Sequence, residues 1–226
     1  MSTVALSGTL QDYLKAIYCL EKESGEVSAS LLARALGVSL PSVTSMMRKL
    51  AARKLIAYTP YLSIALTRAG ERRALEVVRH HRLLETYLQK ALGFSLETLH
   101  DEADRLEHAI SEELEEKIDA FLGRPEFDPH GSPIPDGNGH VAERKLVPLT
   151  ALGPGEEGTV RQITCRGPAQ LRHLESIGLV PGAEVRVQAA EAGSGVLRVL
   201  LPARGDEPIG ESIASCVLVS RTGGGT

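Results

Sequence analysis

The stretch from His100 to His108, which reads His-Asp-Glu-Ala-Asp-Arg-Leu-Glu-His, includes four regularly spaced side chains of the kinds that bind metal ions. If the stretch is helical, these four lie within an arc of roughly 100° on one face, because each residue turns the helix by about 100°. Apolar residues flank that face, so we expect it to border a packed interface. The pattern predicts a metal site with the candidate ligands His100, Asp104, Glu107 and His108. A solvated acidic helix face is the alternative interpretation.

Other residues could complete such a site. His81 and Glu85 have i, i+4 spacing and share one face of the preceding predicted helix. Asp12 adds a carboxylate near the start of the first predicted helix. Imidazole nitrogen and carboxylate oxygen without a thiolate favour manganese or ferrous iron over copper or structural zinc.

The motif Asp104-x-x-Glu107-His108 also invites comparison with the inverted zinc-peptidase signature H-x-x-E-H. Asp104 replaces the first His of that signature, so the second imidazole ligand of a catalytic zinc is missing. The sequence has no nucleophile elbow, P-loop or dinucleotide fingerprint either. We therefore expect that the chain is not an enzyme, and a metallohydrolase remains a third, minor hypothesis.

The composition is that of an ordinary globular protein with more than one domain. The chain has 226 residues, of which 42% are hydrophobic and 24% are charged. No apolar run approaches the roughly 18 residues that a membrane-spanning helix needs, and the N-terminus lacks a secretion signal. We expect a cytoplasmic protein without a membrane partner.

The net charge of −4 hides an asymmetry along the chain. Residues 1–70 hold eight Lys and Arg against four Asp and Glu, whereas residues 71–122 hold seven against thirteen. A basic first third beside an acidic middle is typical of a protein whose first part contacts an anion such as nucleic acid and whose second part binds cations.

The basic first third has the pattern of a helix-turn-helix. A first helix is predicted over residues 8–23, with Thr9 as its cap. A short helix follows Ser28 and stops at Gly37. The next helix begins near Pro41, where the missing N–H of proline is harmless, and the short turn between the two helices completes the motif.

A predicted hairpin, or wing, follows these helices. The runs 55–58 and 62–66 flank Thr59-Pro60-Tyr61 and have the composition of strands. On the preceding helix, short polar side chains suit contacts with base edges, and the basic ones after them suit phosphates. The predicted DNA-binding residues are Ser39, Pro41, Ser42, Thr44, Ser45, Arg48 and Lys49.

The rest of the chain predicts helices, a linker and strands. Helices are expected over residues 68–92 and 96–122, and their apolar surface exceeds what one small domain can cover, which favours a homodimer. The Pro- and Gly-rich segment 124–145 has no periodicity and is predicted to be a linker, in which His130 and His140 are solvated. From residue 146 onward, four short predicted strands (158–163, 184–188, 196–200 and 216–219) and a brief helix at 168–177 predict a small barrel.

With the helix-turn-helix, His81-x-x-x-Glu85 and the His100–His108 string in this order, the sequence resembles the diphtheria-toxin-repressor family of iron- and manganese-dependent transcriptional regulators. The segment Leu171–Val187 resembles the SH3-like domain of that family and of ferrous-iron transport accessory proteins. The resemblance implies a mainly α fold with a small β part. Its domains are a winged helix-turn-helix (1–70), a helical metal-binding and dimerisation domain (71–123), the linker (124–145) and an SH3-like barrel (146–226).

The resemblance also implies two sets of metal ligands. The family's primary site matches Asp12, Asp104, Glu107 and His108. Manganese-responsive members have carboxylates at the first two positions, where iron-responsive members usually have Met and Cys. The ancillary site matches His81, Glu85, His100 and, from the SH3-like domain, Gln170. Gly167 stands where iron regulators have a further acidic ligand.

Lys15 departs from the pattern of short manganese regulators, which have at this position a Glu that helps to bind a pair of metal ions. An ammonium cannot bind a metal ion, so two separated sites for Mn²⁺ or Fe²⁺ are expected in each subunit. The implied function is a metal-dependent repressor of manganese or iron homeostasis that binds double-stranded operator DNA as a homodimer. The alternative is a winged-helix regulator whose metal is structural or absent.

Overall fold

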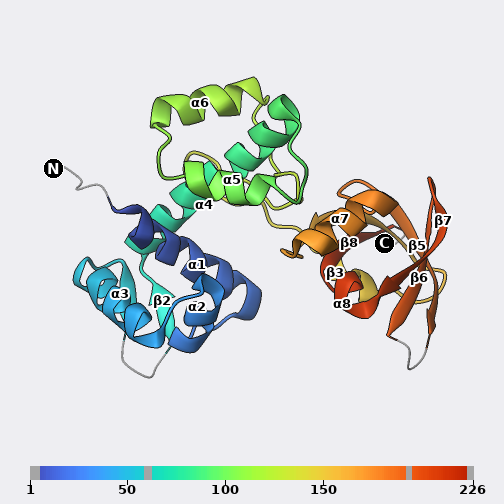
Figure 1. Ribbon diagram of the computed structural model, residues 1–226, viewed down its shortest axis with the longest axis horizontal. Coiled ribbons are helices and arrows are strands. Elements are labelled where there is room, and N and C mark those ends of the chain that lie inside the picture. The colour runs from blue at the N-terminus through green and yellow to red at the C-terminus, as the bar shows by residue number, and fades with distance from the viewer. Residues whose placement is uncertain (1–5, 59–62, 192–194, 223–226) are drawn as a thin grey trace. The chain divides into compact units, whose positions relative to one another are not determined.

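The computed structural model describes residues 6–58, 63–191 and 195–222. It divides into two compact units. The first unit consists of residues 1–81, 106–112 and 135–140. The second unit consists of residues 82–105, 113–134 and 141–226. Figure 1 shows the order of the helices and strands.

The first unit contains the predicted winged helix-turn-helix. Its elements are α1 (Gly8–Ser24), α2 (Ala29–Leu36), α3 (Leu40–Ala52), β1 (Ile56–Tyr58), β2 (Ile64–Leu66) and the first part of α4 (Arg68–Leu92). Ser28 caps α2 by accepting a hydrogen bond from the Leu31 amide, and Gly37 ends it with a left-handed φ of 65°. The side chain of Ser39 caps α3 by accepting from the Ser42 amide. These local signals confirm the predicted motif.

In the first unit, the predicted cap of the first helix is wrong, and the predicted turn of the wing lies outside the described residues. Helix α1 begins at Gly8 after Ser7, so Thr9 lies inside the helix and the predicted cap was wrong. Strands β1 and β2 pair in antiparallel register, with Ala57 opposite Ala65. The predicted turn Thr59-Pro60-Tyr61 and the start of the second predicted run at Leu62 lie outside the described residues.

Helices α1, α2 and α3 bury one apolar face each to form the core of the first unit. The largest fully buried side chains in it are Leu14, Ile17, Leu32, Met47, Leu50 and Ile64. Gly70 on α4 lies so close to this core that a Cβ atom there would be 1.9 Å from the Leu55 carbonyl oxygen. Close packing therefore fixes α4 against the end of the wing strands.

The predicted continuous helix over residues 96–122 was wrong. The chain forms α5 (Leu99–Leu106), a turn at 107–109 and α6 (Glu112–Phe121). The Ala109 amide donates to the Leu106 carbonyl at 2.9 Å, which tightens the last turn of α5. Ser111, a residue type that favours helix N-termini, then precedes Glu112 and Glu113, whose charges suit the positive end of a new helix.

The C-terminal part of the second unit is the predicted small barrel. Six antiparallel strands lie in the order β3-β8-β4-β5-β6-β7. Their bounds are β3 (Val147–Pro148), β4 (Glu157–Ile163), β5 (Glu184–Glu191), β6 (Val196–Leu201), β7 (Gly205–Gly210) and β8 (Val217–Thr222). The predicted helix is α7 (Pro168–Ile177), and short helices η1 (Leu149–Ala151) and α8 (Glu211–Ala214) complete the barrel. Strands β3 and β7 were missed, because one has two residues and the other contains Gly and Pro.

The segment predicted to be a linker is packed rather than free. Phe127 forms a β-bridge with Pro133, and Asp128 and Ile134 are buried. The Arg144 guanidinium lies 3.3 Å from the centroid of the Phe127 ring, where a cation–π contact is favourable. Within the described residues, no helix is long and apolar enough to span a membrane.

Candidate metal centre

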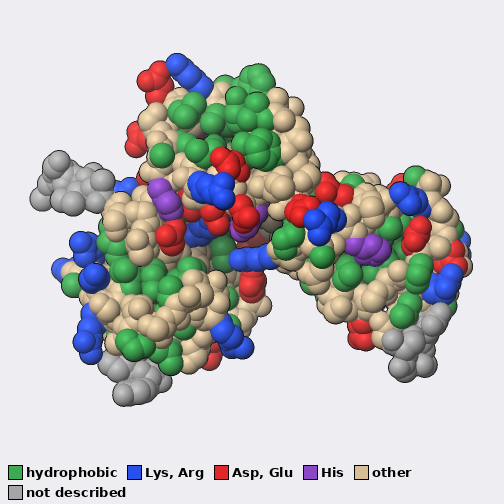
Figure 2. All heavy atoms as spheres, viewed as in Figure 1, with side chains coloured by type: hydrophobic (Ala, Val, Ile, Leu, Met, Phe, Trp, Pro, Cys, Tyr) green, Lys and Arg blue, Asp and Glu red, His purple; other side chains and the backbone are tan. Residues whose placement is uncertain are grey.

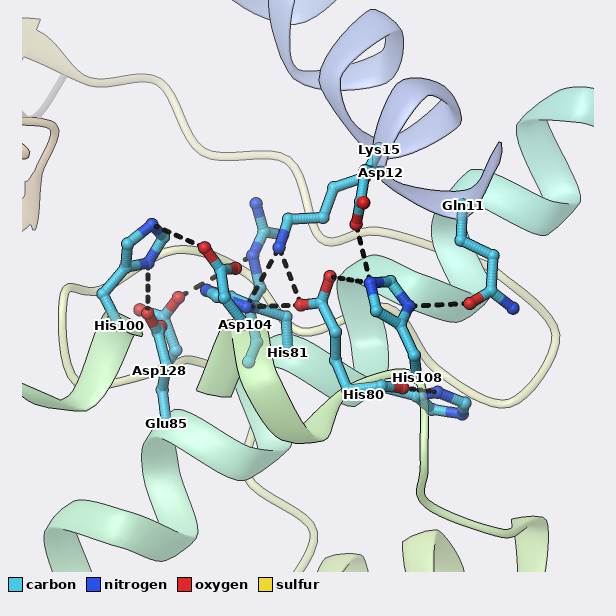
Figure 3. A network of polar contacts seen from close by, with 12 residues as sticks. Gln11, Asp12, Lys15, His80, His81, Glu85, His100, Asp104, His108 and Asp128 are labelled. Carbon is cyan, nitrogen blue, oxygen red and sulfur yellow. Dashed lines mark hydrogen bonds and ion pairs between the residues drawn. The ribbon is translucent and has the colours of Figure 1, made fainter. Parts of the chain in front are cut away.

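Asp12, Glu107 and His108 form a first cluster, which lies within the first unit. His108 Nε2 is 2.6 Å from Asp12 Oδ1 and 3.6 Å from Glu107 Oε1 (Figure 3). One ligand atom from each of these residues lies within 4.8 Å of the others, which is close enough for one ion to contact all of them. The cluster therefore joins α1 to the turn that follows α5.

The imidazole of His108 is oriented by a neighbour that is not a candidate ligand. His108 Nδ1 lies 2.7 Å from Gln11 Oε1. An amide oxygen can only accept, so Nδ1 donates to Gln11, and Nε2 is the ring nitrogen that faces Asp12 and Glu107. Metal-binding histidines are commonly fixed by such a second hydrogen bond. Sequence reasoning missed Gln11, although it directly precedes Asp12.

Lys15 and His81 contact the other oxygen of Glu107. Lys15 Nζ is 2.7 Å from Glu107 Oε2 and 3.1 Å from His81 Nδ1. His81 Nδ1 itself lies 2.6 Å from Glu107 Oε2. The Glu107 side chain is 1% exposed and that of Lys15 is 19% exposed, so the ammonium offsets a buried negative charge.

Asp104 lies beside His100 on α5. His100 Nε2 lies 3.8 Å from Asp104 Oδ2, one helical turn away, and the Asp104 side chain is 47% exposed. Because α5 ends at Leu106, Glu107 and His108 do not continue the helical face on which Asp104 lies. The predicted arc of four residues on one helix face is therefore not formed.

A second cluster consists of Glu85, Asp128 and His130 and lies within the second unit. It also offers one ligand atom per residue within 4.8 Å. His130 Nδ1 is 3.4 Å from Glu85 Oε2, and His100 Nδ1 is 3.0 Å from Glu85 Oε1. The structure thus brings together Glu85 and His100, as predicted, and adds Asp128 and His130.

The predicted ligand Gln170 lies at the start of α7, against Gly167. Its Oε1 is 2.8 Å from the position that a Cβ atom on Gly167 would occupy.

Burial and the charges of neighbouring side chains shift the pKa values of Asp128 and His130 in the second cluster. Burial, and after it the charge of Glu85, raises the pKa of Asp128 to about 6, although Arg82 nearby opposes the shift. Burial lowers the pKa of His130, but the hydrogen bond and charge of Glu85 outweigh it, so the net pKa of His130 is raised. Carboxylates held so close together favour a cation between them.

Sequence reasoning missed Asp128 and His130 because the surrounding segment has no periodicity. The prediction that His130 is solvated was wrong, since its side chain is 12% exposed. Asp128 Oδ1 accepts hydrogen bonds from the amides of His130 and Ser132 at 2.9 and 2.8 Å. The available signal was an Asp and a His two residues apart around a proline, which is typical of a fixed turn.

Leu96 lies between the second cluster and the barrel. Its amide donates to Glu175 Oε1 on α7 at 3.2 Å, and its carbonyl accepts a hydrogen bond from His130. Arg172, also on α7, pairs with Glu97 at 2.6 Å. Helix α7 and the second cluster therefore hold the same short loop.

The predicted DNA-binding residues lie along α3 and its cap. Six of them are exposed: Ser39, Pro41, Ser42, Ser45, Arg48 and Lys49. Thr44 is half-buried, and its hydroxyl donates to the Leu40 carbonyl at 3.0 Å. An exposed helix with short polar residues first and basic ones after them is the geometry with which a recognition helix enters the major groove.

A winged helix-turn-helix together with clusters of carboxylates and imidazoles defines the class of metal-dependent DNA-binding regulators. Comparison with protein families supports this class. "Iron dependent repressor, N-terminal DNA binding domain" matches residues 5–64, and "Iron dependent repressor, metal binding and dimerisation domain" matches residues 67–136. A FeoA domain matches residues 147–221.

Individual relatives extend the match to nearly the whole chain. The iron-dependent repressor IdeR of Mycobacterium leprae (strain TN) is 31% identical over 228 residues, covering 96% of this chain and 98% of that protein. A solved manganese-dependent transcriptional repressor in complex with manganese is 38% identical with a TM-score of 0.88, covering 94% of this chain and 100% of that one. ScaR with bound Zn²⁺ is 28% identical with a TM-score of 0.78, covering 94% and 99%.

The chain belongs to the diphtheria-toxin-repressor family of iron- and manganese-dependent transcriptional repressors. The predicted fold class and the predicted regulatory function are confirmed. These relatives are transcriptional repressors and not enzymes, which agrees with the departure of Asp104 from the peptidase signature.

Proposed function

We propose that this chain represses genes of manganese or iron homeostasis by binding operator DNA as a homodimer when Mn²⁺ or Fe²⁺ is bound. The observation that supports this most directly is the first cluster, in which Asp12 of α1 meets Glu107 and His108. A metal-dependent contact at this position acts on the helix that packs against the DNA-binding elements. The cytoplasm, where such DNA is found, is the proposed location.

The donor set fits these metals. Asp12 and Glu107 offer carboxylate oxygens, His108 offers an imidazole nitrogen, and no thiolate is among them. Hard and intermediate donors of this kind suit manganese and ferrous iron. A bound divalent cation supplies the positive charge that lets both carboxylates and the imidazole remain close together. Asp104, which the family resemblance places in this site, is proposed as an outer contributor, since its carboxylate lies toward His100.

The residues of the first cluster can influence DNA binding through α1. This helix buries Leu14 and Ile17 in the same core as Leu32 of α2 and Met47 of α3. Asp12 therefore fixes the helix-turn-helix relative to Glu107 and His108 whenever the three residues are held together. Bound metal favours the DNA-binding arrangement of the subunit only to the extent that it binds this arrangement more tightly than others. A difference of about 1–3 kcal/mol in metal-binding free energy would change DNA affinity by roughly 5- to 150-fold.

We propose the second cluster as a further metal site, formed by Glu85, Asp128 and His130 with His100 beside them. Two carboxylates, one of them with a raised pKa, together with imidazole nitrogens at a buried position, support this assignment. Gln170 and His81 are the other residues that the resemblance implied for the ancillary site. Each subunit would then hold two separate ions.

An exposed apolar surface supports the homodimer. Leu92, Leu114 and Phe121 are 58%, 46% and 68% exposed, and Figure 2 shows hydrophobic side chains gathered over α6. Tyr87 stacks edge-on against Phe121, with ring centroids 5.9 Å apart. Exposed apolar groups of this size are typical of an interface between copies. A dimer presents two recognition helices to two half-sites of double-stranded DNA.

The test is a gel-shift titration with operator DNA, comparing Mn²⁺ with anaerobic Fe²⁺ and with chelator. We expect retarded DNA with metal and free DNA with chelator. Glu107→Gln should lose the metal response, whereas Glu116→Gln on the exposed side of α6 should keep it. Binding that survives chelation would favour the alternative, a winged-helix regulator whose metal is structural or absent.

A further inference from the structure

Two of the three cysteines of the chain meet in the barrel. Cys165 is buried in the barrel core, and Cys216 is half-buried and packs against the same core. Their side chains share a hydrogen bond, and neither cysteine is in a disulfide. The fold therefore brings two reduced thiols into contact, one of them partly accessible to solvent, although they lie far apart in the sequence.

The backbone holds the two cysteines at this contact. Ile163 on β4 pairs with Val217 on β8, and the cysteines lie just beyond this pair. The amide and the hydroxyl of Thr164 both donate to the Cys216 carbonyl, at 2.8 and 3.1 Å. Cys216 is thus fixed, whereas Cys165 lies in the irregular connection between β4 and α7. Such a connection adapts more easily than a strand to the sulfur–sulfur distance of a disulfide, about 2.0 Å.

The surroundings of the two sulfur atoms differ. Burial, and next the hydrogen bond with Cys216, raises the pKa of the Cys165 thiol to about 12, so this thiol stays protonated. The half-buried Cys216 thiol donates to the Ser212 carbonyl at 3.3 Å, and Ser212 itself is exposed. A small oxidant from solvent therefore meets Cys216 first, and Cys165 is the thiol that lies ready for the second step.

We propose that Cys165 and Cys216 are a dithiol site for hydrogen peroxide, which they reduce while forming a disulfide. The Cys216 sulfur attacks one peroxide oxygen, the O–O bond breaks, and a sulfenic acid and one water result. The Cys165 sulfur then attacks the sulfenic sulfur, and its proton leaves with the sulfenic hydroxyl as a second water. In total, two thiols lose two electrons and two protons, and one peroxide becomes two waters.

The disulfide would join the connection between β4 and α7 to the residue that precedes β8. A small dithiol can reverse it by thiol–disulfide exchange, as is usual for disulfides of redox-sensing proteins in reducing compartments. No candidate metal ligand takes part in the reaction, so this inference stands apart from the proposed metal-dependent function.

The experiment treats the reduced full-length protein with hydrogen peroxide in the presence of a chelator. Free thiols are counted with dithionitrobenzoate after denaturation, and tryptic peptides are analysed by mass spectrometry after the free thiols have been blocked. We expect the count to fall from three thiols per chain to one. A peptide pair that links Cys165 to Cys216 and has lost two hydrogen atoms should appear, and dithiothreitol should restore all the thiols.

Matched variants separate this pair from the third cysteine, Cys19, which lies on α1 in the first unit. Cys19→Ser should form the same disulfide and lose both of its remaining thiols. Cys165→Ser should form no disulfide within the chain, and dimedone should capture the sulfenic acid on Cys216. Cys216→Ser should leave Cys165 reduced, because the buried sulfur has then lost its accessible partner.

The thiol count and the peptide map of the unsubstituted protein are decisive, so the test does not depend on the folding of a variant. Three thiols that persist in peroxide would overturn the inference. A disulfide that includes Cys19 or joins two subunits would overturn it too. Oxidation of Cys216 to a sulfinic acid without a bond to Cys165 would show that the two thiols only pack together.

Discussion

Glu107 and Asp104 have the same chemistry and lie three residues apart, yet their surroundings differ. Glu107 is 2% exposed and contacts His81, Lys15 and His108, whereas Asp104 is exposed and faces His100. The sequence predicted both as ligands from helical spacing. It could not predict that the helix ends between them, because that depends on which of several weak helix-ending and helix-starting signals prevails.

This difference predicts unequal effects on metal binding. Glu107→Gln removes a buried charged donor and should lower the affinity of the first cluster for Mn²⁺ by more than about tenfold. Asp104→Asn changes an exposed carboxylate that lies toward His100, and should lower it by less than about threefold. Isothermal titration of the two variants measures both values. Equal losses would show that Asp104 joins the cluster when metal binds.

Asp128 predicts a dependence of stability on pH in the metal-free protein. Burial, and next the charge of Glu85, raises its pKa from 3.8 to about 6. The folded state therefore binds this proton more tightly than the unfolded state does. The contribution of Asp128 to the free energy of unfolding should therefore be greatest below about pH 4, fall between about pH 4 and about pH 6, and stay constant above that.

Asp128→Asn removes that penalty, since an amide does not ionise and its oxygen can still accept from His130 and Ser132. Above pH 7 the metal-free variant should be more stable than the wild type, by at most about 3 kcal/mol. Near pH 3 the difference should vanish. Urea unfolding in chelator at both pH values measures this. A variant that is less stable above pH 7 would show that the ion pair with Arg82 dominates.

At the scale of helices and strands, the sequence predicted the helices whose ends have clear signals, but it did not predict segments whose signals are weak. Ser28 and Gly37 bound α2 as predicted, and α4 and α7 have the predicted ends. The segment around Asp128 has a fixed structure although its sequence has no helical or strand periodicity. Hydrogen bonds from backbone amides to a side chain, together with packing, hold it in place. For the same reason the sequence identified Glu85 and His100 but not Asp128 and His130.

The close approach of α4 to the wing gives a prediction for Gly70. A Cβ atom there would lie 1.9 Å from the Leu55 carbonyl oxygen, which is backbone and cannot turn aside. Gly70→Ala should therefore lower the free energy of unfolding by about 1–3 kcal/mol or more, although alanine favours helices. Gly137→Ala is the control, since a Cβ atom there meets nothing within 4 Å. Urea denaturation compares the two variants, and equal stabilities would contradict the close contact.

At the scale of the whole molecule, the order of the motifs along the chain was enough to predict the family. The distribution of charge agreed with it, since the basic first third holds the recognition helix and the acidic middle holds Asp104 and Glu107. The arrangement of the ligands within the fold was not predictable, because it depends on contacts between segments far apart in sequence, such as Asp12 with His108.

Salt dependence tests the DNA-binding surface. Arg48 is exposed on α3, and a phosphate contact there releases counterions on binding. Arg48→Ala should weaken operator binding and reduce the slope of log K against log salt by about 0.9. Arg105→Ala, an exposed change on α5, should leave the slope unchanged. Fluorescence anisotropy over a range of salt concentrations measures both, and an unchanged slope for Arg48→Ala would remove Arg48 from the interface.

Leu96 joins the barrel to a buried cluster through its backbone alone, with its amide on Glu175 and its carbonyl on His130. Because a peptide chain keeps its backbone groups whatever its side chain, this link survives most substitutions of Leu96 itself. Substitutions on α7 can instead move the loop that contains Leu96, and so alter the second cluster without changing any of its candidate ligands. Under the proposed function, the barrel is therefore a part of the chain where substitutions can change the metal affinity of the second cluster while its candidate ligands stay the same.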